Sequence, residues 1–148
     1  MKVGLVGCCK RKLDRSGPAR EVYASIHFKT ALAWSERFCD VTFIASTGLG
    51  LLTPDDSISP YSATFSTNSA ALRGEGRLPE VDPKVWATAI VAKLKQRIAQ
   101  SDELVFLCGR AYWSPIIECA DLGCMRYRVP FDHRLATKTS LIRKELSP

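Results

Sequence analysis

A loop of cysteines and lysines near the start of the sequence is the first place where side chains capable of catalysis gather. It directly follows a short apolar run and reads Gly7-Cys8-Cys9-Lys10-Arg11-Lys12. Three cations beside a thiol stabilise a thiolate, so the pattern favours a nucleophilic Cys8 or Cys9. Lys10 and Lys12 can instead hold phosphate, or act as a nucleophilic amine if desolvated. The alternative is an exposed basic loop with a buried cysteine; the glycine spacing of a P-loop is absent.

A second segment combines hydroxyl side chains with glycines and a rigid turn. It reads Ser46-Thr47-Gly48-Leu49-Gly50-Leu51-Leu52, with Pro60-Tyr61 eight residues further on. Such a loop after a strand offers backbone N–H groups to an anion. Pro60 sets a turn that presents the Tyr61 ring for stacking on a base, although a tyrosine in such a turn also serves simple packing. The third glycine of a dinucleotide fingerprint is missing.

The third segment is Cys108-Gly109-Arg110-Ala111-Tyr112-Trp113. Gly109 permits close approach of the backbone, and Arg110 offers a bidentate fork to an anion. Tyr112 or Trp113 offers an aromatic ring, and Tyr112, like Tyr61, could stack on a base. The alternative is a turn with two partly buried aromatic residues. His27 and His133 are isolated in the sequence and are interpreted as solvated or structural.

Charge is concentrated at the two ends of this 148-residue chain, whose net charge is +6. Residues 1–20 hold six basic and one acidic side chain, and residues 126–148 hold six basic and two acidic ones. If both ends fold to one side, they form a positive face suited to phosphate or nucleic acid; the alternative is a solvated basic surface. The length predicts one domain. No apolar run is long enough for a bilayer and no secretory signal is recognisable, so we expect a soluble cytoplasmic protein with no membrane partner.

The six cysteines predict free thiols rather than a disulfide framework or a metal site. They contain no C-x-x-C pair, only two histidines accompany them, and a reducing compartment is expected. Cys39, Cys108 and Cys119 lie in apolar surroundings typical of core positions. We therefore expect neither a metal nor another cofactor.

Alternating strand and helix patterns supply the elements that must position these loops. The pattern predicts strands over 2–7, 41–45, 103–108 and 125–129, and helices over 19–38, 82–100 and 112–121. A long loop at about 46–82 and a basic tail at about 130–148 complete a single α/β domain. We expect a mostly parallel central sheet of about four strands flanked by helices, and a ligand site where the strands' carboxyl ends bring the three loops together.

The order of these motifs along the chain is similar to that of a known family. Cys8-x-Lys10-x-Lys12-Leu13 is followed by Pro18-Ala19-Arg20-Glu21-Val22-Tyr23-Ala24-Ser25, then by Ser46-x-x-x-Gly50-Leu51-Leu52, Pro60-Tyr61 and Gly109-x-x-Tyr112. Over about residues 3 to 130 this resembles a family of small bacterial and phage domains of unknown function related to the peroxide-stress protein YaaA. The resemblance implies an α/β fold and a link to DNA or nucleobases. The sequence departs from the family at Gly48-Leu49, where relatives often carry a polar pair; if that pair is catalytic, this member has altered activity or only binds.

Two functions from different classes follow. The first is an enzyme that processes a nucleotide or nucleobase, at the glycosidic bond or at the base, in free form or in nucleic acid. The second is a DNA-binding module without catalysis; a small protein-interaction factor has the least support. For the enzyme, the candidate catalytic residues are Cys8, Lys10, Lys12 and Ser46. The candidate substrate-binding residues, some carried only by the resemblance, are Arg20, Tyr23, Ser25, Thr47, Gly50, Pro60, Tyr61, Gly109, Arg110 and Tyr112.

Overall fold

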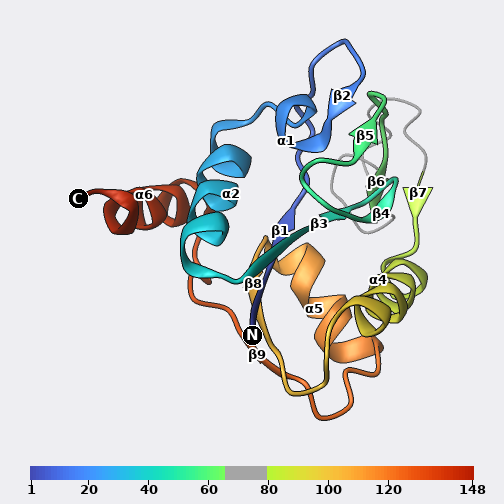
Figure 1. Ribbon diagram of the computed structural model, residues 1–148. Helices are drawn as coiled ribbons and strands as arrows, with labels where there is room; N and C mark the ends of the chain where they lie inside the picture. The colour runs from blue at the N-terminus through green and yellow to red at the C-terminus, as the bar shows by residue number, and fades with distance from the viewer. Residues whose placement is uncertain (66–79) are drawn as a thin grey trace.

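A five-stranded sheet forms the middle layer of the protein. The computed structural model describes residues 1–65 and 80–148 (Figure 1). The strand order is β4-β3-β1-β8-β9, with all pairs parallel except the antiparallel pair of β3 and β4. The strands are β1 (Lys2–Gly7), β3 (Val41–Ser46), β4 (Gly50–Leu52), β8 (Glu103–Leu107) and β9 (Arg126–Arg128). The expected α/β domain with a mostly parallel sheet is thus confirmed, with five strands instead of about four.

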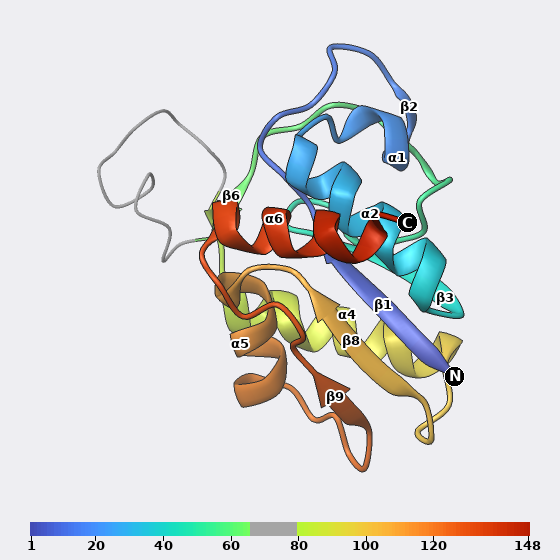
Figure 2. The ribbon, with the colours of Figure 1, turned by 90° about the vertical axis from the view of Figure 1, so that its left-hand side faces the viewer.

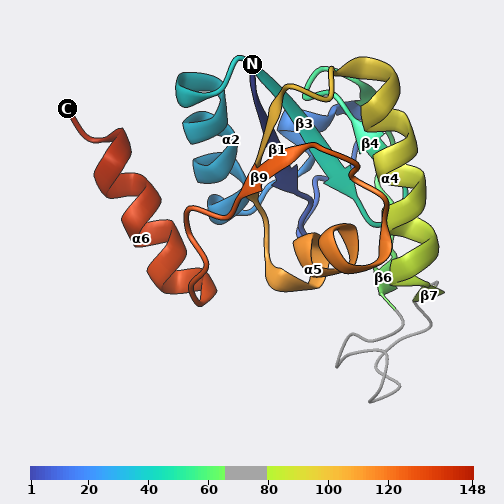
Figure 3. The same cartoon turned by 90° about the horizontal axis from the view of Figure 1, so that it is seen from below.

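Two pairs of helices cover the sheet, one pair on each face (Figure 3). One face carries α2 (Ile26–Phe38) and α6 (Leu135–Leu146), and the other carries α4 (Pro83–Arg97) and α5 (Arg110–Cys119). Successive strand residues point to opposite faces, so Leu5 packs in the core under α4 while Val6 packs in the core under α2. Because both faces are buried, the central strands read as nearly continuous apolar runs.

The connections between strands create a switch in direction beside β1. The chain passes from β1 through α2 to β3 on one side, and later through α4, on the opposite face, to β8 on the other side. Figure 2 shows β1 and β8 side by side, with α6 crossing near the carboxyl end of β1. In open α/β sheets, ligands bind in the crevice outside the carboxyl ends of the strands at such a point. The topology therefore marks the ends of β1 and β8 as the place to look for a site.

Two features of the chain differ from the sequence-based expectation. The single helix expected over 19–38 is wrong: it divides into α1 (Ala19–Val22) and α2, because Tyr23 forms a bridge with Lys12 and the Ser25 hydroxyl caps α2 by accepting from Phe28 N at 3.3 Å. The region expected as loop contains β4, β5 (Ser57–Ile58), β6 (Thr64–Phe65) and β7 (Glu80–Val81). β5 pairs with β2 (Gly17–Pro18), and β6 with β7.

The basic tail, to which the sequence pattern assigned no structure, forms the helix α6. Other boundaries agree closely with the prediction, including the start of α4. There the Asp82 carboxylate accepts from Lys84 N at 2.8 Å and from Val85 N at 3.4 Å, and Pro83 occupies the first turn. The part of the expected loop that spans 66–79 lies outside the described residues. Within the described ranges, no helix has the length and apolar character required to cross a membrane.

Candidate functional site

The Cys8 thiol lies where the loops after β1 and β3 meet the start of α5, the helix that follows β8. Cys8 directly follows β1, Thr47 follows β3, and Tyr112 lies in the first turn of α5 after β8. The Cys8 Sγ accepts a hydrogen bond from Thr47 N at 3.3 Å, and it lies 3.5 Å from Thr47 Oγ1 and 3.3 Å from the Tyr112 hydroxyl. One backbone N–H and two hydroxyls therefore surround the sulfur. The Thr47 hydroxyl donates to the Tyr112 hydroxyl at 3.3 Å, so a thiolate would accept from Thr47 N and from the Tyr112 hydroxyl.

Burial keeps Tyr112 in its neutral form. Its ring packs edge-on against Phe65 and Trp86, with ring centroids 5.2 Å and 5.7 Å away. Burial is the main cause of the raised pKa of its hydroxyl, which also lies against Cys8. Since the ring is enclosed by other aromatic rings, Tyr112 presents a hydroxyl to the site; the sequence had also offered it as a stacking platform.

A second group of hydroxyls lies behind Thr47. Ser46 is fully buried, and its Oγ accepts from the Tyr23 hydroxyl at 2.9 Å and from Leu49 N at 3.0 Å. The Tyr61 hydroxyl contacts Ser46 Oγ and lies 2.6 Å from the Tyr23 hydroxyl. Burial raises the pKa of Tyr23 to about 12 and also raises that of Tyr61. Both phenols stay protonated at neutral pH, so this network fixes the segment around β3 and carries no charge.

Lys12 lies over the aromatic part of this network. Its Nζ donates to the carbonyl oxygens of Cys9 at 2.9 Å and Lys10 at 3.3 Å, and stands 4.4 Å from the centre of the Tyr61 ring. Desolvation lowers the pKa of Lys12, while the nearby Cys8 and Cys9 oppose that shift. The cation is therefore held in place by carbonyls and a ring face, next to the thiol-bearing loop.

Three hollows in the surface meet at the Cys8–Lys12 loop, and Lys10 lines all of them. One, of about 260 Å³, is bounded by Cys8, by the end of β8 and by residues of α2 and α6. We call it the switch-point hollow, because it lies at the carboxyl ends of β1 and β8. Another, of about 390 Å³, is lined by Lys12, Pro60 and Tyr61 among others. The third, of about 490 Å³, borders the start of α2.

Several of the remaining candidate residues have structural partners elsewhere. Arg20 is held by ion pairs of 2.8 Å with Asp55 and of 2.8 Å with Glu36. Ser25 is buried as the cap of α2, and Arg110 is exposed with its guanidinium 5.4 Å from the Trp113 ring centre. None of these three side chains joins the group around Cys8.

Two of the candidate glycines shape the backbone instead. Gly50, the first residue of β4, has a φ of +79°, a conformation that L side chains rarely adopt. Gly109 is the N-cap of α5, and a Cβ there would meet no atom within 4 Å. The space beside Gly109 is open to the switch-point hollow, which this residue lines.

The position at which this sequence departs from its expected relatives has no room for a side chain. A Cβ on Gly48 would lie 2.5 Å from Cε2 and 2.6 Å from Cδ2 of Tyr61. The Tyr61 ring therefore occupies the space that a polar residue at position 48 would need. The Tyr61 ring can take this position only because residue 48 is a glycine.

Two residues that sequence reasoning did not select also line the switch-point hollow. They are Lys138 of α6 and His27 of α2. His27 was interpreted as solvated or structural, and Lys138 lay in a tail to which no structure was assigned. Both side chains line the hollow because α6 packs against α2. The order of motifs in the sequence does not show this packing.

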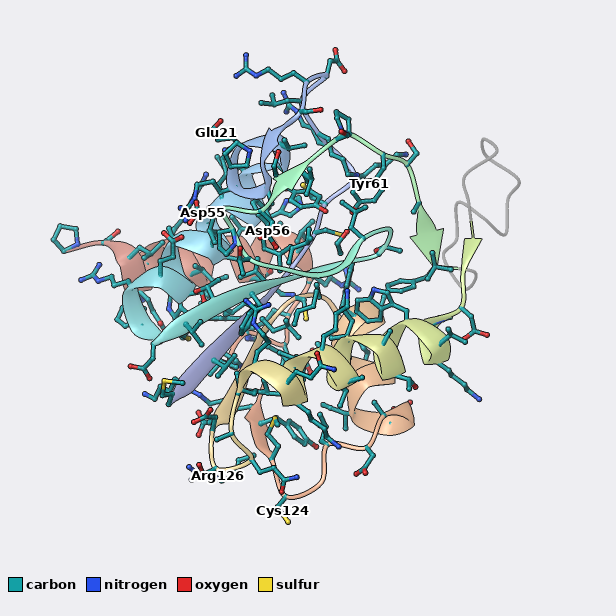
Figure 4. All side chains as sticks on the ribbon, turned by 45° about the vertical axis from the view of Figure 1, so that its right-hand side comes forward. Glu21, Asp55, Asp56, Tyr61, Cys124 and Arg126 are labelled. Carbon is teal, nitrogen blue, oxygen red and sulfur yellow. The ribbon has the colours of Figure 1, made fainter. Side chains whose placement is uncertain are left out.

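The two basic ends of the chain meet only in part. Lys10 and Lys138 line the same hollow. Arg126, in contrast, lies opposite Glu103 in the register of β8 and β9, at the opposite end of the sheet from the Cys8 loop. Figure 4 shows Arg126 and Cys124 at the far end of the molecule from Tyr61. Within the described residues, no three His, Cys, Asp or Glu side chains are grouped to hold a metal ion.

These features define a class: a small doubly wound α/β protein with a thiol, hydroxyls and lysines at the carboxyl ends of its strands. The chain belongs to the family of unknown function DUF6884, whose model matches residues 3–141. No curated protein and no solved structure matched in the corresponding comparisons.

Proposed function

We propose that this protein is an enzyme that processes a nucleotide or nucleobase at the switch-point hollow. The observation that carries the proposal is the placement of the Cys8 thiol on the wall of that hollow, with Thr47 N–H, the Thr47 hydroxyl and the Tyr112 hydroxyl within 3.5 Å of its sulfur. Donors arranged around a thiol support a nucleophilic thiolate. The link to nucleotides rests on the resemblance to YaaA-related domains and on the lysines beside the thiol.

The reaction that this arrangement suits best is cleavage of a glycosidic bond. The Cys8 thiol would lose its proton to solvent and attack C1′ of the sugar as the thiolate; the sulfur–carbon bond forms as the carbon–nitrogen bond breaks, and the base leaves with the electron pair and gains a proton from solvent. A water molecule would then attack C1′ and release a proton to solvent as the carbon–sulfur bond breaks with its electron pair on sulfur, which restores the thiolate and gives the free sugar. Thr47 N–H would hold the sulfur before attack and after release.

In this proposal Ser46 acts through its neighbours, whereas Lys12 contacts the ligand. Ser46 is fully buried, so it positions Tyr61 and the loop at Leu49 without touching substrate. Lys12 and Tyr61 line the 390 Å³ hollow, where they would contact the part of the ligand that extends out of the switch-point hollow. Lys10, which lines both hollows, would hold phosphate between them.

One observation favours the alternative of a DNA-binding module. Lys10, Arg11 and Arg15 are exposed along the loop after β1, and none of them forms an ion pair with another described residue. A row of exposed cations beside an aromatic residue suits single-stranded nucleic acid. In that case the binding constant falls steeply as salt rises.

The test is a thermal-shift screen against nucleotides, nucleosides, free bases and short single- and double-stranded DNA at two salt concentrations. Binding at about 100 times the dissociation constant adds about 2.7 kcal/mol of stability. Compounds that stabilise the protein are then incubated with wild-type protein and with Cys8→Ala, and the products are separated by chromatography. The matched control is Cys124→Ala, at the far end of the sheet (Figure 4).

We expect stabilisation by a nucleotide or base at both salt concentrations, turnover by wild-type and Cys124→Ala protein, and no turnover by Cys8→Ala. Stabilisation by DNA alone, abolished at the higher salt concentration, would identify the protein as a binding module. Turnover that survives in Cys8→Ala would remove the nucleophilic role of the thiol.

A further inference from the structure

Among the described residues, the switch-point hollow has two cations on its wall, Lys10 from the loop after β1 and Lys138 from α6, and no Asp or Glu. His27 of α2 also lines it; burial and the nearby Lys138 lower the pKa of this imidazole, which favours its neutral form. The three residues come from separate elements, so the helix packing described above brings them to one cavity. A cavity lined in this way attracts an anion.

Lys138 is the most informative of the three, because its charge is buried. The residue is 8% exposed, and its Nζ donates to the carbonyl oxygen of Cys108 at 3.1 Å. No ion pair joins it to an acidic side chain in the part of the chain that the structure describes, although Asp132 acts on it from further away. Burying an ammonium without a counter-charge is costly, and an anionic ligand would supply that charge.

The start of α5 adds hydrogen-bond donors at the same place. Gly109 is its N-cap and lines the hollow, and no side chain caps the first turn of this ten-residue helix. The first N–H groups of a helix have no partner within the helix, and the helix dipole favours negative charge there. The carbonyl that holds Lys138 belongs to Cys108, the residue directly before this cap. The buried ammonium and the start of the helix therefore face one small volume.

We propose that this end of the switch-point hollow binds the phosphate group of the substrate, with Lys138 as its buried ligand. The inference rests on the proposed function for the identity of the rest of the molecule: the substrate is a nucleotide, and a nucleoside or free base is a poorer ligand. A phosphate has several acceptor oxygens and up to two negative charges, which matches two lysines and the first turn of α5. Lys138 is a binding residue that sets specificity; the Cys8 thiol remains the reacting group.

The experiment compares a nucleoside that binds in the screen with its 5′-monophosphate by titration calorimetry at constant ionic strength. The proteins are wild type, Lys138→Met, which keeps most of the aliphatic stem, and Lys144→Met, which removes an exposed lysine from the same helix. Wild type and Lys144→Met should bind the monophosphate roughly 10- to 100-fold more tightly than the nucleoside, the value of a charge-assisted hydrogen bond. Lys138→Met should lose most of that preference. If Lys138→Met keeps the preference of the wild type, the inference is wrong.

A second measurement separates the anion site from the proposed function. Inorganic phosphate is titrated into the same three proteins with sodium chloride as the ionic-strength control, and the melting temperature is followed. A rise in wild type and Lys144→Met that is absent in Lys138→Met supports the anion site, even if no base-containing compound binds and the proposed function fails. Equal rises in all three proteins contradict it. If nucleosides and nucleotides bind and react equally well, the anion site fails while the proposed function stands.

The melting temperature of Lys138→Met without ligand shows whether a loss of phosphate binding could come from unfolding. Because the wild-type ammonium is buried without a counter-charge, the variant should melt at the same temperature as wild type or higher in the absence of ligand. A large drop in melting temperature would show that the bond to the Cys108 carbonyl is structural, and would contradict the inference.

Discussion

Replacing Ser46 by alanine removes the hydroxyl at the centre of the buried network beside the site. Ser46 is fully buried, and its Oγ accepts from Leu49 N at 3.0 Å and from the Tyr23 hydroxyl at 2.9 Å. In the variant the Tyr23 hydroxyl keeps its 2.6 Å hydrogen bond with the Tyr61 hydroxyl, but Leu49 N–H loses its acceptor. One unsatisfied group of this kind costs about 1–3 kcal/mol. At about 2 kcal/mol, the melting temperature of a domain this size falls by about 4–8 °C.

The assay is urea denaturation of Ser46→Ala, of Tyr23→Phe and of the double variant. The two single changes remove the same hydrogen bond, so the loss in the double variant should fall short of their sum by at least about 0.5 kcal/mol. Ser59→Ala is the control, because the 2.9 Å contact of Ser59 with Ser16 is exposed and its loss should stay within about 0.5 kcal/mol. Strict additivity, or a Ser46→Ala loss no larger than that of Ser59→Ala, would refute the network.

Three further predictions concern the groups around this network. Gly48→Ala places a Cβ 2.5 Å from the Tyr61 ring, so thermal melting should show a loss of about 1–3 kcal/mol of stability, and unchanged melting would show that the ring moves freely. Lys12→Ala should raise KM for the substrate found in the screen more than it lowers kcat, because Lys12 contacts the part of the ligand outside the switch-point hollow; a loss of kcat with KM unchanged would contradict that role. Burial lowers the pKa of Lys138 in the folded state, so the cost of its charge is present at neutral pH and disappears as pH rises toward 10.5, the ordinary value that applies to the unfolded chain. The stability advantage of Lys138→Met over wild type, measured by urea denaturation, should therefore shrink between pH 7 and pH 10.5, and a constant or widening advantage would contradict the burial of an unpaired charge.

Much of the framework of the site was predictable from the sequence. Buried parallel strands are continuous apolar runs, and such a run ends at Gly7 directly before Cys8. Because parallel strands end at one edge of the sheet, the loops after β1, β3 and β8 had to lie together. The contacts among Cys8, Thr47 and Tyr112 confirm that expectation of proximity. Their chemical role stays a prediction.

What the sequence did not show depends on contacts between distant segments. The break between α1 and α2 follows from the bridge of Tyr23 to Lys12, a partner that local helix propensity does not include. Arg20 matched a motif, but its ion pairs with Asp55 and Glu36 need the folded chain.

The role of Lys138 required knowing that the tail is a helix and that it packs on α2. One sequence pattern did indicate this helix. Leu135, Lys138 and Ile142 follow helical spacing, which places them on the same face of a helix. The lysine stood on the apolar face, where a charge indicates a buried partner or a ligand.

The central claim is that the Cys8 thiol reacts with a nucleotide or nucleobase bound in the switch-point hollow. The most direct measurement is chromatographic analysis of turnover by wild type, Cys8→Ala and Cys124→Ala on the compound that stabilises the protein most, with binding of that compound measured in parallel. The account predicts that Cys8→Ala binds the compound but forms no product, while Cys124→Ala matches wild type. Product formation by Cys8→Ala at the wild-type rate would contradict it.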